Sequence, residues 1–183
     1  MGAGFSRPER STGPTIGPPD RVSEYPHHLR TFDYVGVYRY FLTFCTFERN
    51  RLFVAADAVG VAHEQILRAG ATENFSLDAY CYMPDHLHLL AEAEREDCNL
   101  KRFISRAKQC SGFHFKRTMK QTLWQRYGYE RVLRSEEDTI VVARYIVENP
   151  VRAGLVVSPL DYPFWGSSTW SREELLEYVR RAD

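Results

Sequence analysis

The stretch from Phe75 to Ala93, FSLDAYCYMPDHLHLLAEA, contains two apolar runs separated by Pro84-Asp85. Proline followed by aspartate is typical of a turn, so the pattern predicts two antiparallel strands joined by a tight turn. Side chains two residues apart in a strand point to the same face. His86 and His88 would therefore form a side-by-side pair of imidazoles, while the leucines that follow each of them face the other way, into a core.

The segments on either side of this hairpin carry the patterns of further strands and helices. Aromatic and β-branched runs predict strands, and apolar residues at helical spacing predict helices. The expected elements are a strand at 38–47, a helix at 56–70 that stops at Gly70, a helix over most of 100–120 capped by Asn99, a strand at 129–133, a helix from the N-cap Ser135 to about Glu148 that Pro150 ends, and a short helix opening at Ser171.

The order of these elements is strand, helix, strand, strand, helix, strand, helix. It predicts an α+β protein with a ferredoxin-like β-α-β-β-α-β core and an antiparallel sheet, followed by a helix. Helices would cover one face of the sheet and leave the other for a ligand or an added helix. We expect a flexible N-terminal leader at 1–30, one domain at 31–170 and a C-terminal helix at 171–183.

Composition favours a soluble, cytoplasmic domain. The 183 residues are 44% hydrophobic and 14% aromatic, which is typical of a globular fold rather than of disorder. The chain lacks an apolar run of about eighteen residues, as a membrane span needs, and its N-terminus lacks the apolar core of a secretory signal. The four cysteines have no C-x-x-C spacing, so we expect reduced thiols: Cys45, Cys81, Cys98 and Cys110.

Charge is segregated along the chain although its formal net value is zero. Residues 100–134 carry ten Lys or Arg and a single acid, Glu130, which gives this segment a charge of +9. Aromatic residues are interleaved with these charges, as in surfaces that bind single-stranded nucleic acid, although a solvated helix face is the plainer alternative. The candidate DNA-binding residues here are Lys101, Arg102, Arg106, Lys108, Lys116, Arg117 and Lys120.

The chemistry-bearing residues are ambiguous when each is taken alone. The histidine pair fits a half-exposed sheet face as well as a metal site, and two ligands are too few for structural zinc. In ARYIVENPVRAGLV (143–156), Tyr145 and Asn149 stand four residues apart and so share one helix face. Separately, Tyr145 fits an amphipathic tyrosine with a buried ring, and Asn149 fits a helix end before proline.

Taken together, these patterns resemble the HUH-type Y1 transposases of the IS200/IS605 superfamily, and most closely the REP-associated tyrosine transposases. Three stretches carry the resemblance and lie within about 34–170 of the chain. They are similar to the family's first strand, its His-hydrophobic-His segment and its C-terminal block, and read YRYFLTFCTFERNRLF (38–53), AYCYMPDHLHLLAE (79–92) and LWQRYGYERVLRSEEDTIVVARYIVENPVRAGLV (123–156).

The resemblance implies a metal-dependent single-stranded DNA endonuclease and strand transferase. His86 and His88 would be ligands of a divalent cation, Mg or Mn, and Tyr145 would be the nucleophile that forms a 5′-phosphotyrosine link. Asn149 would take the position of the amide that completes the metal site, where related enzymes have Gln. Arg152 is a candidate phosphate contact, or alternatively a helix cap. By its ligand types alone, a two-histidine site also suits Co or Zn.

The implied partner is single-stranded DNA folded into a REP-like hairpin, bound in the cytoplasm at the nucleoid. We expect a monomer, with a homodimer as the alternative. Two other functions stay open from the sequence: a non-catalytic hairpin-DNA binding protein of the same fold, and an unrelated metal-dependent hydrolase that uses the histidine pair.

Overall fold

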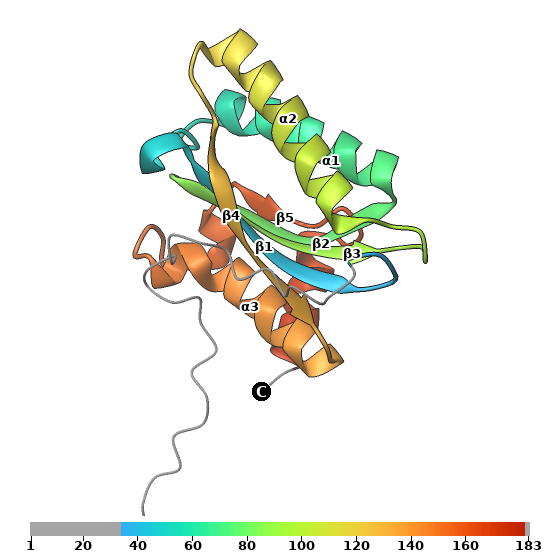
Figure 1. Cartoon of the computed structure of the whole chain (residues 1–183). Helices are drawn as coiled ribbons and strands as arrows, with labels where there is room; N and C mark the ends of the chain where they lie inside the picture. The colour runs from blue at the N-terminus through green and yellow to red at the C-terminus, as the bar shows by residue number, and fades with distance from the viewer. Residues whose placement is uncertain (1–33, 182–183) are drawn as a thin grey trace, which may run out of the picture.

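A five-stranded antiparallel sheet in the order β4-β1-β3-β2-β5 forms the centre of the computed structural model, which describes residues 34–181 (Figure 1). The order of its first four strands is that of the predicted ferredoxin-like β-α-β-β-α-β core, which is confirmed. The elements are β1 (Arg39–Thr46), α1 (Ala56–Glu73), β2 (Phe75–Met83), β3 (His86–Ala93), α2 (Leu100–Met119), β4 (Trp124–Leu133), α3 (Glu136–Arg152), β5 (Trp165–Gly166) and α4 (Arg172–Arg180), with short 3-10 turns at Phe47–Arg49 and Pro159–Asp161.

The hairpin predicted from Phe75–Ala93 forms β2 and β3. Met83 pairs with His86 across the Pro84-Asp85 turn, and β3 also pairs with β1 along its length. The alternation of side chains along β3 then separates two faces, because Leu87 and Leu89 lie in one hydrophobic core while Leu90 lies in another. His86 and His88 share the face of Leu90, as the sequence predicts.

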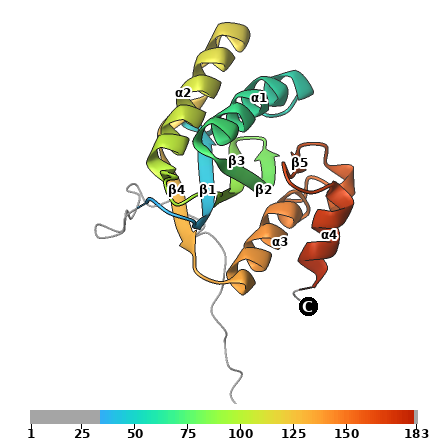
Figure 2. The same ribbon diagram turned by 90° about the vertical axis from the view of Figure 1, so that its right-hand side faces the viewer.

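Two helical layers cover the two faces of the sheet. The pair α1 and α2 lies over one face, and α3 and α4 lie over the other (Figure 2). The first core packs the side chains of Leu42, Leu87 and Leu89 against those of α1 and α2. The second packs Phe41 and Leu90 against α3 and α4. The histidine pair therefore faces the α3 layer.

Three predicted boundaries were wrong. Helix α1 runs past Gly70 to Glu73 and ends at Asn74, which adopts the left-handed conformation that terminates many helices. Gly70 is needed for space, since a Cβ there would stand 2.7 Å from the Phe75 carbonyl oxygen. Strand β4 begins at Trp124 rather than at 129, because the partner strand β1 offers Thr46 for pairing with Trp124.

The third wrong boundary is Pro150, which lies inside α3 instead of ending it. A proline this close to a helix C-terminus removes one backbone hydrogen bond and leaves the last turn intact. The helix continues to Arg152, and the Ala153 amide donates to the Asn149 carbonyl. Asn149 is therefore a helical residue rather than a helix end.

The C-terminal helix forms where the sequence predicts it. Ser171 caps α4 in a capping box with Glu174, and Leu175 and Val179 are buried in the core that α3 shares. None of the helices within 34–181 is long and apolar enough to cross a membrane. The expected leader at 1–30 lies outside the described residues.

Candidate functional site

The two histidines of β3 point their distal nitrogens at each other. The Nε2 atoms of His86 and His88 are 3.0 Å apart, and the rings are almost perpendicular, with centroids 4.5 Å apart. His88 is buried, and His86 is partly exposed. The pair thus places two imidazole nitrogens side by side on the face of the sheet that α3 covers.

The other ring nitrogens are held by neighbouring polar groups. Nδ1 of His86 lies 2.7 Å from the Asp85 carboxylate, and Nδ1 of His88 lies 2.9 Å from the Thr43 hydroxyl. Arg49 in turn pairs with Asp85 at 2.9 Å. Such outer contacts are characteristic of metal-ligating histidines, because they fix the tautomer that leaves the Nε2 lone pair free.

Electrostatics keeps the buried histidine neutral. Burial, reinforced by the nearby charges of His86 and Arg49, lowers the pKa of His88 well below its ordinary value. Burial acts in the opposite direction on Asp85, but the hydrogen bond and charge of His86 and the charge of Arg49 lower the pKa of this carboxyl. Near neutral pH, His88 therefore presents a lone pair and Asp85 a negative charge.

The spacing of the pair fits a shared cation. Metal–nitrogen bonds of about 2.1 Å that meet at a right angle separate the two nitrogens by about 3.0 Å, which is the distance found here. Within residues 34–181 there is no cluster of three His, Cys, Asp or Glu side chains that could hold a metal. Among these described residues, a further protein ligand would therefore be of another type, such as an amide.

Helix α3 brings Tyr145 to the histidine pair. The Tyr145 ring centroid is 5.4 Å from that of His88 and 5.8 Å from that of Phe41. The guanidinium carbon of Arg152 lies 5.1 Å from the centroid of the Tyr145 ring. Helix α3 thus brings the Tyr145 hydroxyl-bearing ring and the Arg152 guanidinium to the two imidazoles of β3.

Asn149 occupies the next turn of the same helix face and is buried. Helix α3 begins beside Arg39, which pairs with Glu92 near the far end of β3, and it passes His88 at Tyr145. The turn that carries Asn149 consequently lies further along β3, towards His86.

The basic residues of α2 lie on the opposite face of the sheet from this cluster, and several of them have partners within the fold. Arg102 and Arg106 pair with the buried carboxylate of Glu73 at 3.1 and 2.5 Å. Lys108 donates to the Gln125 carbonyl at 2.7 Å, and burial lowers its pKa to about 8. Lys101 stands over the ring of Tyr34.

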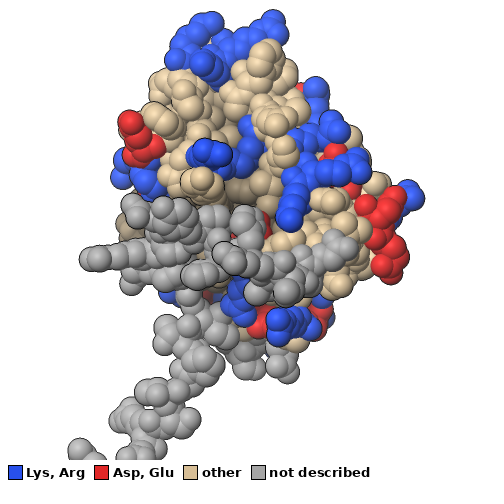
Figure 3. Space-filling view, in the orientation of Figure 1, with Lys and Arg blue, Asp and Glu red and all other residues tan. Residues whose placement is uncertain are grey.

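The remaining basic candidates cluster at the end of α2. Lys116 and Arg117 are exposed in its last turn, and Lys120 follows directly. Figure 3 shows Lys and Arg gathered over this end of the helix. Of the eight sequence-predicted DNA-binding residues, Arg152 is the one that contacts Tyr145.

Thr43, Asp85 and Arg49 were missed by the sequence reasoning. Asp85 stands next to His86 in the sequence but was interpreted as a turn residue alone. Thr43 reaches His88 through the pairing of β1 with β3, in which the two residues are register partners. Alternation in the 38–47 strand could have placed Thr43 on the face of Phe41, but its partner depended on the register.

Comparisons with known proteins point to one family. The family model described as "Transposase IS200 like" matches residues 34–149. A Haemophilus influenzae protein named "Putative REP-associated tyrosine transposase" is 33% identical over 101 residues, which cover 49% of this chain and 57% of that protein. The fold is similar to a solved REP-associated tyrosine transposase bound to a REP hairpin, with a TM-score of 0.64 and 22% identity over 79% of this chain and 82% of the other.

Proposed function

Because the chain belongs to the IS200-like transposase family, we propose that it is a metal-dependent single-stranded DNA endonuclease and strand transferase acting on REP-type hairpins. The observation that carries the proposal is the contact between Tyr145 and His88, whose ring centroids are 5.4 Å apart. This contact joins a potential nucleophile to a potential cation site within one chain.

In the proposed reaction, the Tyr145 hydroxyl oxygen attacks the phosphorus of a DNA phosphodiester. A bond forms between tyrosine and phosphorus, the bond from phosphorus to the 3′ oxygen breaks, and the proton lost by tyrosine ends on the departing 3′-hydroxyl. The product is a 5′-phosphotyrosine link. A 3′-hydroxyl of another strand can reverse the step, so strand transfer needs no external energy source.

His86 and His88 would hold the divalent cation, Mg or Mn, with the side-chain oxygen of Asn149 as the proposed third ligand. A bound cation of this kind neutralises charge on a non-bridging phosphate oxygen. Asp85 and Thr43 orient the two imidazoles through their Nδ1 atoms. The Nε2 spacing of 3.0 Å supports this assignment.

Arg152 is the cation that the chain itself contributes beside the nucleophile. Its guanidinium carbon lies 5.1 Å from the centroid of the Tyr145 ring, so a positive charge stands beside the side chain that would attack the phosphate. This charge would stabilise the negative charge of the phosphate in the transition state.

The proposed substrate is hairpin DNA, bound in the cytoplasm at the nucleoid. The name and bound hairpin of the relatives support it, as do the exposed cations at the end of α2: Lys116, Arg117 and Lys120. Because Tyr145 and the histidine pair meet in one chain, we propose that the protein acts as a monomer.

The test is covalent capture. The protein is incubated with end-labelled single-stranded oligonucleotides that each carry a REP-type hairpin and single-stranded flanks, in Mn²⁺ or Mg²⁺, and adducts are resolved on denaturing gels. We expect an adduct with the wild type and none with Tyr145→Phe or with His86→Ala. Hairpin binding without an adduct in either metal would instead establish a non-catalytic binding protein, and cleavage that survives Tyr145→Phe would establish a hydrolase.

A further inference from the structure

Helix α3 is fastened to α4 at the residue next to the proposed nucleophile. Arg144 donates from both Nε and Nη2 to the carbonyl oxygen of Val179, at 3.0 and 2.7 Å. Successive helical residues are about 100° apart around the axis, so Arg144 faces α4 while Tyr145 faces His88. Two donors on one acceptor oppose rotation of α3 about its own axis.

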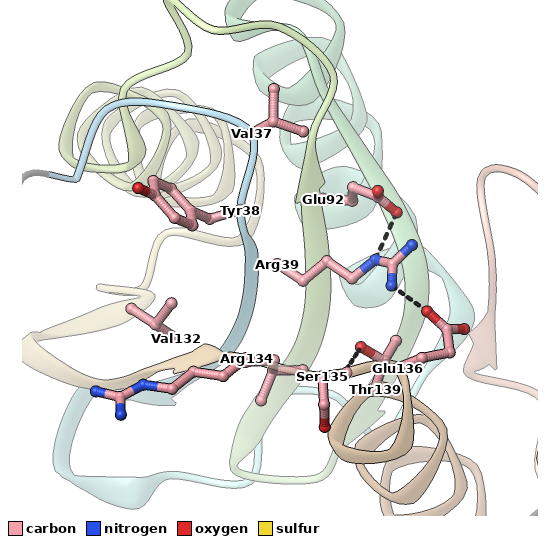
Figure 4. Close-up of a pocket in the computed structure, with 10 residues that line it drawn as sticks. Val37, Tyr38, Arg39, Glu92, Val132, Arg134, Ser135, Glu136 and Thr139 are labelled. Carbon is pink, nitrogen blue, oxygen red and sulfur yellow. Dashed lines mark hydrogen bonds and ion pairs between the residues drawn. The ribbon is translucent and has the colours of Figure 1, made fainter.

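The first turn of α3 has a second set of attachments. Glu136 accepts from Arg39 of β1 and, at 2.5 Å, from the hydroxyl of Tyr178 on α4. Arg39 also donates to Glu92 of β3 at 2.9 Å. Figure 4 shows Arg39 extending between these two carboxylates at the rim of a pocket of about 450 Å³ where α3 begins.

Helix α4 is itself anchored to the sheet. Arg172 donates to the Trp165 carbonyl at 3.1 and 2.9 Å and stacks over the Trp165 ring. Trp165 pairs with Cys81 of β2, and Val179 is buried in the shared core. The family model ends at residue 149, so α4 lies beyond the region that the family match covers.

We propose that α4 positions the nucleophile. The contacts of Arg144, Glu136 and Tyr178 fix the rotation of α3 about its axis and its position along that axis, and so keep Tyr145 beside the histidine pair of the same chain. This inference rests on the proposed function of Tyr145. A tyrosine hydroxyl lies roughly 8 Å from a helix axis, so a rotation of about 10° displaces it by about 1.4 Å. A misplacement of about 1 Å can reduce a catalytic rate about 100-fold. The three residues act through Tyr145 and are positioning residues.

The first experiment compares Arg144→Met and Tyr178→Phe with Arg181→Met. Arg181 is an exposed arginine of the same region that pairs with Glu177 of α4 and serves as the matched control. Adduct formation is measured at saturating hairpin DNA and well below each melting temperature. We expect a decrease of about 10- to 100-fold for Arg144→Met and about 3- to 10-fold for Tyr178→Phe, with unchanged hairpin affinity and an unchanged control. Arg144→Lys, which keeps one donor, should recover part of the rate.

The second experiment uses rescue by Arg144→Lys, a readout that a merely structural role would not move. Adduct rates of Arg144→Met, Arg144→Lys and wild type are compared at the same interval below each melting temperature. We expect Arg144→Lys to be faster than Arg144→Met, because lysine can still donate one hydrogen bond to the Val179 carbonyl. Equal rates for the two variants would contradict a positioning role for this hydrogen bond.

The outcomes separate the two proposals. If wild type forms an adduct and the Arg144 and Tyr178 variants match its rate, α4 does not position Tyr145. If wild type forms no adduct, the proposed function fails, and amide hydrogen exchange then tests α4 alone. Faster exchange of α3 amides in Arg144→Met than in Arg181→Met would support the attachment of α3 by α4, and equal exchange would refute it.

Discussion

Thr43 of β1 and His88 of β3 are register partners, and the Thr43 hydroxyl lies 2.9 Å from Nδ1 of His88. The contact joins two neighbouring strands and holds the His88 ring so that its Nε2 atom points towards His86. Both residues are buried, so solvent does not replace the hydroxyl if it is removed. The orientation of the His88 ring therefore depends on a residue of the neighbouring strand β1.

Thr43→Val should weaken cation binding while preserving the fold. The substitution keeps the shape of the side chain but leaves Nδ1 of His88 without its partner, and loss of such an outer contact typically costs about 10- to 100-fold in metal affinity. The measurement is adduct formation as a function of Mn²⁺ concentration. Thr72→Val, at an exposed position on α1, is the control, and an unchanged Mn²⁺ midpoint in Thr43→Val would contradict the role assigned to the hydroxyl.

The basic residues of α2 should divide into two classes. Replacing Lys116 and Arg117 by Gln should lower the salt dependence of hairpin binding by roughly 0.7 to 0.9 per residue in log–log slope, because each lost phosphate contact releases one fewer counterion. Stability should hardly change, because both side chains are exposed in the structure. A salt slope equal to that of wild type would remove this end of α2 from the DNA interface.

Arg106→Met should act mainly on stability. It removes the 2.5 Å partner of Glu73, whose buried carboxylate keeps Arg102 at 3.1 Å. We expect the free energy of unfolding to fall by about 1–3 kcal/mol in urea titrations. If unfolding is unaffected while hairpin affinity falls, Arg106 contacts DNA and its ion pair with Glu73 is dispensable.

Asp78→Asn should stabilise the protein at pH 7. Burial, with the hydrogen bond to Glu92, raises the pKa of Asp78 to about 6. A raised carboxyl pKa means that the fold loses stability as the pH rises from about 4 to about 6, and the penalty persists at pH 7. Asparagine carries no charge and can still accept from Ser76, so we expect a gain of roughly 1–3 kcal/mol at pH 7 that vanishes near pH 4.

Urea unfolding at pH 4, 5.5 and 7 tests the prediction for Asp78. Asp97→Asn, at an exposed position, is the control. An Asp78→Asn variant that is less stable than wild type at pH 7 would mean that the carboxylate is favourably paired in the fold.

Two glycines of α1 should respond to alanine in opposite directions. A Cβ at Gly70 would meet the Phe75 carbonyl oxygen at 2.7 Å, whereas a Cβ at Gly60 has no neighbour within 4 Å. Gly70→Ala should destabilise by about 1–3 kcal/mol through overpacking, and Gly60→Ala should stabilise by about 0.5–1 kcal/mol through helix propensity. Thermal melts of both variants test this prediction. A Gly70→Ala variant with the melting temperature of wild type would show that β2 can move away from α1.

Local patterns predicted the common face of His86 and His88, because strand alternation and a proline turn act over a few residues. The partners of these residues could not be predicted equally well. Thr43 reaches His88 only through strand register, and Glu73 neutralises Arg106 from another helix, 33 residues earlier in the chain. The basic residues of α2 could be counted from the sequence. Which of them form ion pairs within the fold and which stay exposed depended on tertiary packing. Pro150 was misjudged because its cost depends on how much helix follows it.

The spacing of the histidine pair has a consequence for thermal stability. The Nε2 atoms of His86 and His88 lie 3.0 Å apart in a hydrogen bond in which one ring donates to the other, and a divalent cation would take the place of the shared proton. Such a cation would bind the native state and find no equivalent site in the unfolded chain. It would then act as a folding ligand, and the melting temperature should increase with the logarithm of the Mn²⁺ concentration above the dissociation constant. Chelators would return the protein to its lower melting temperature even when no DNA is present.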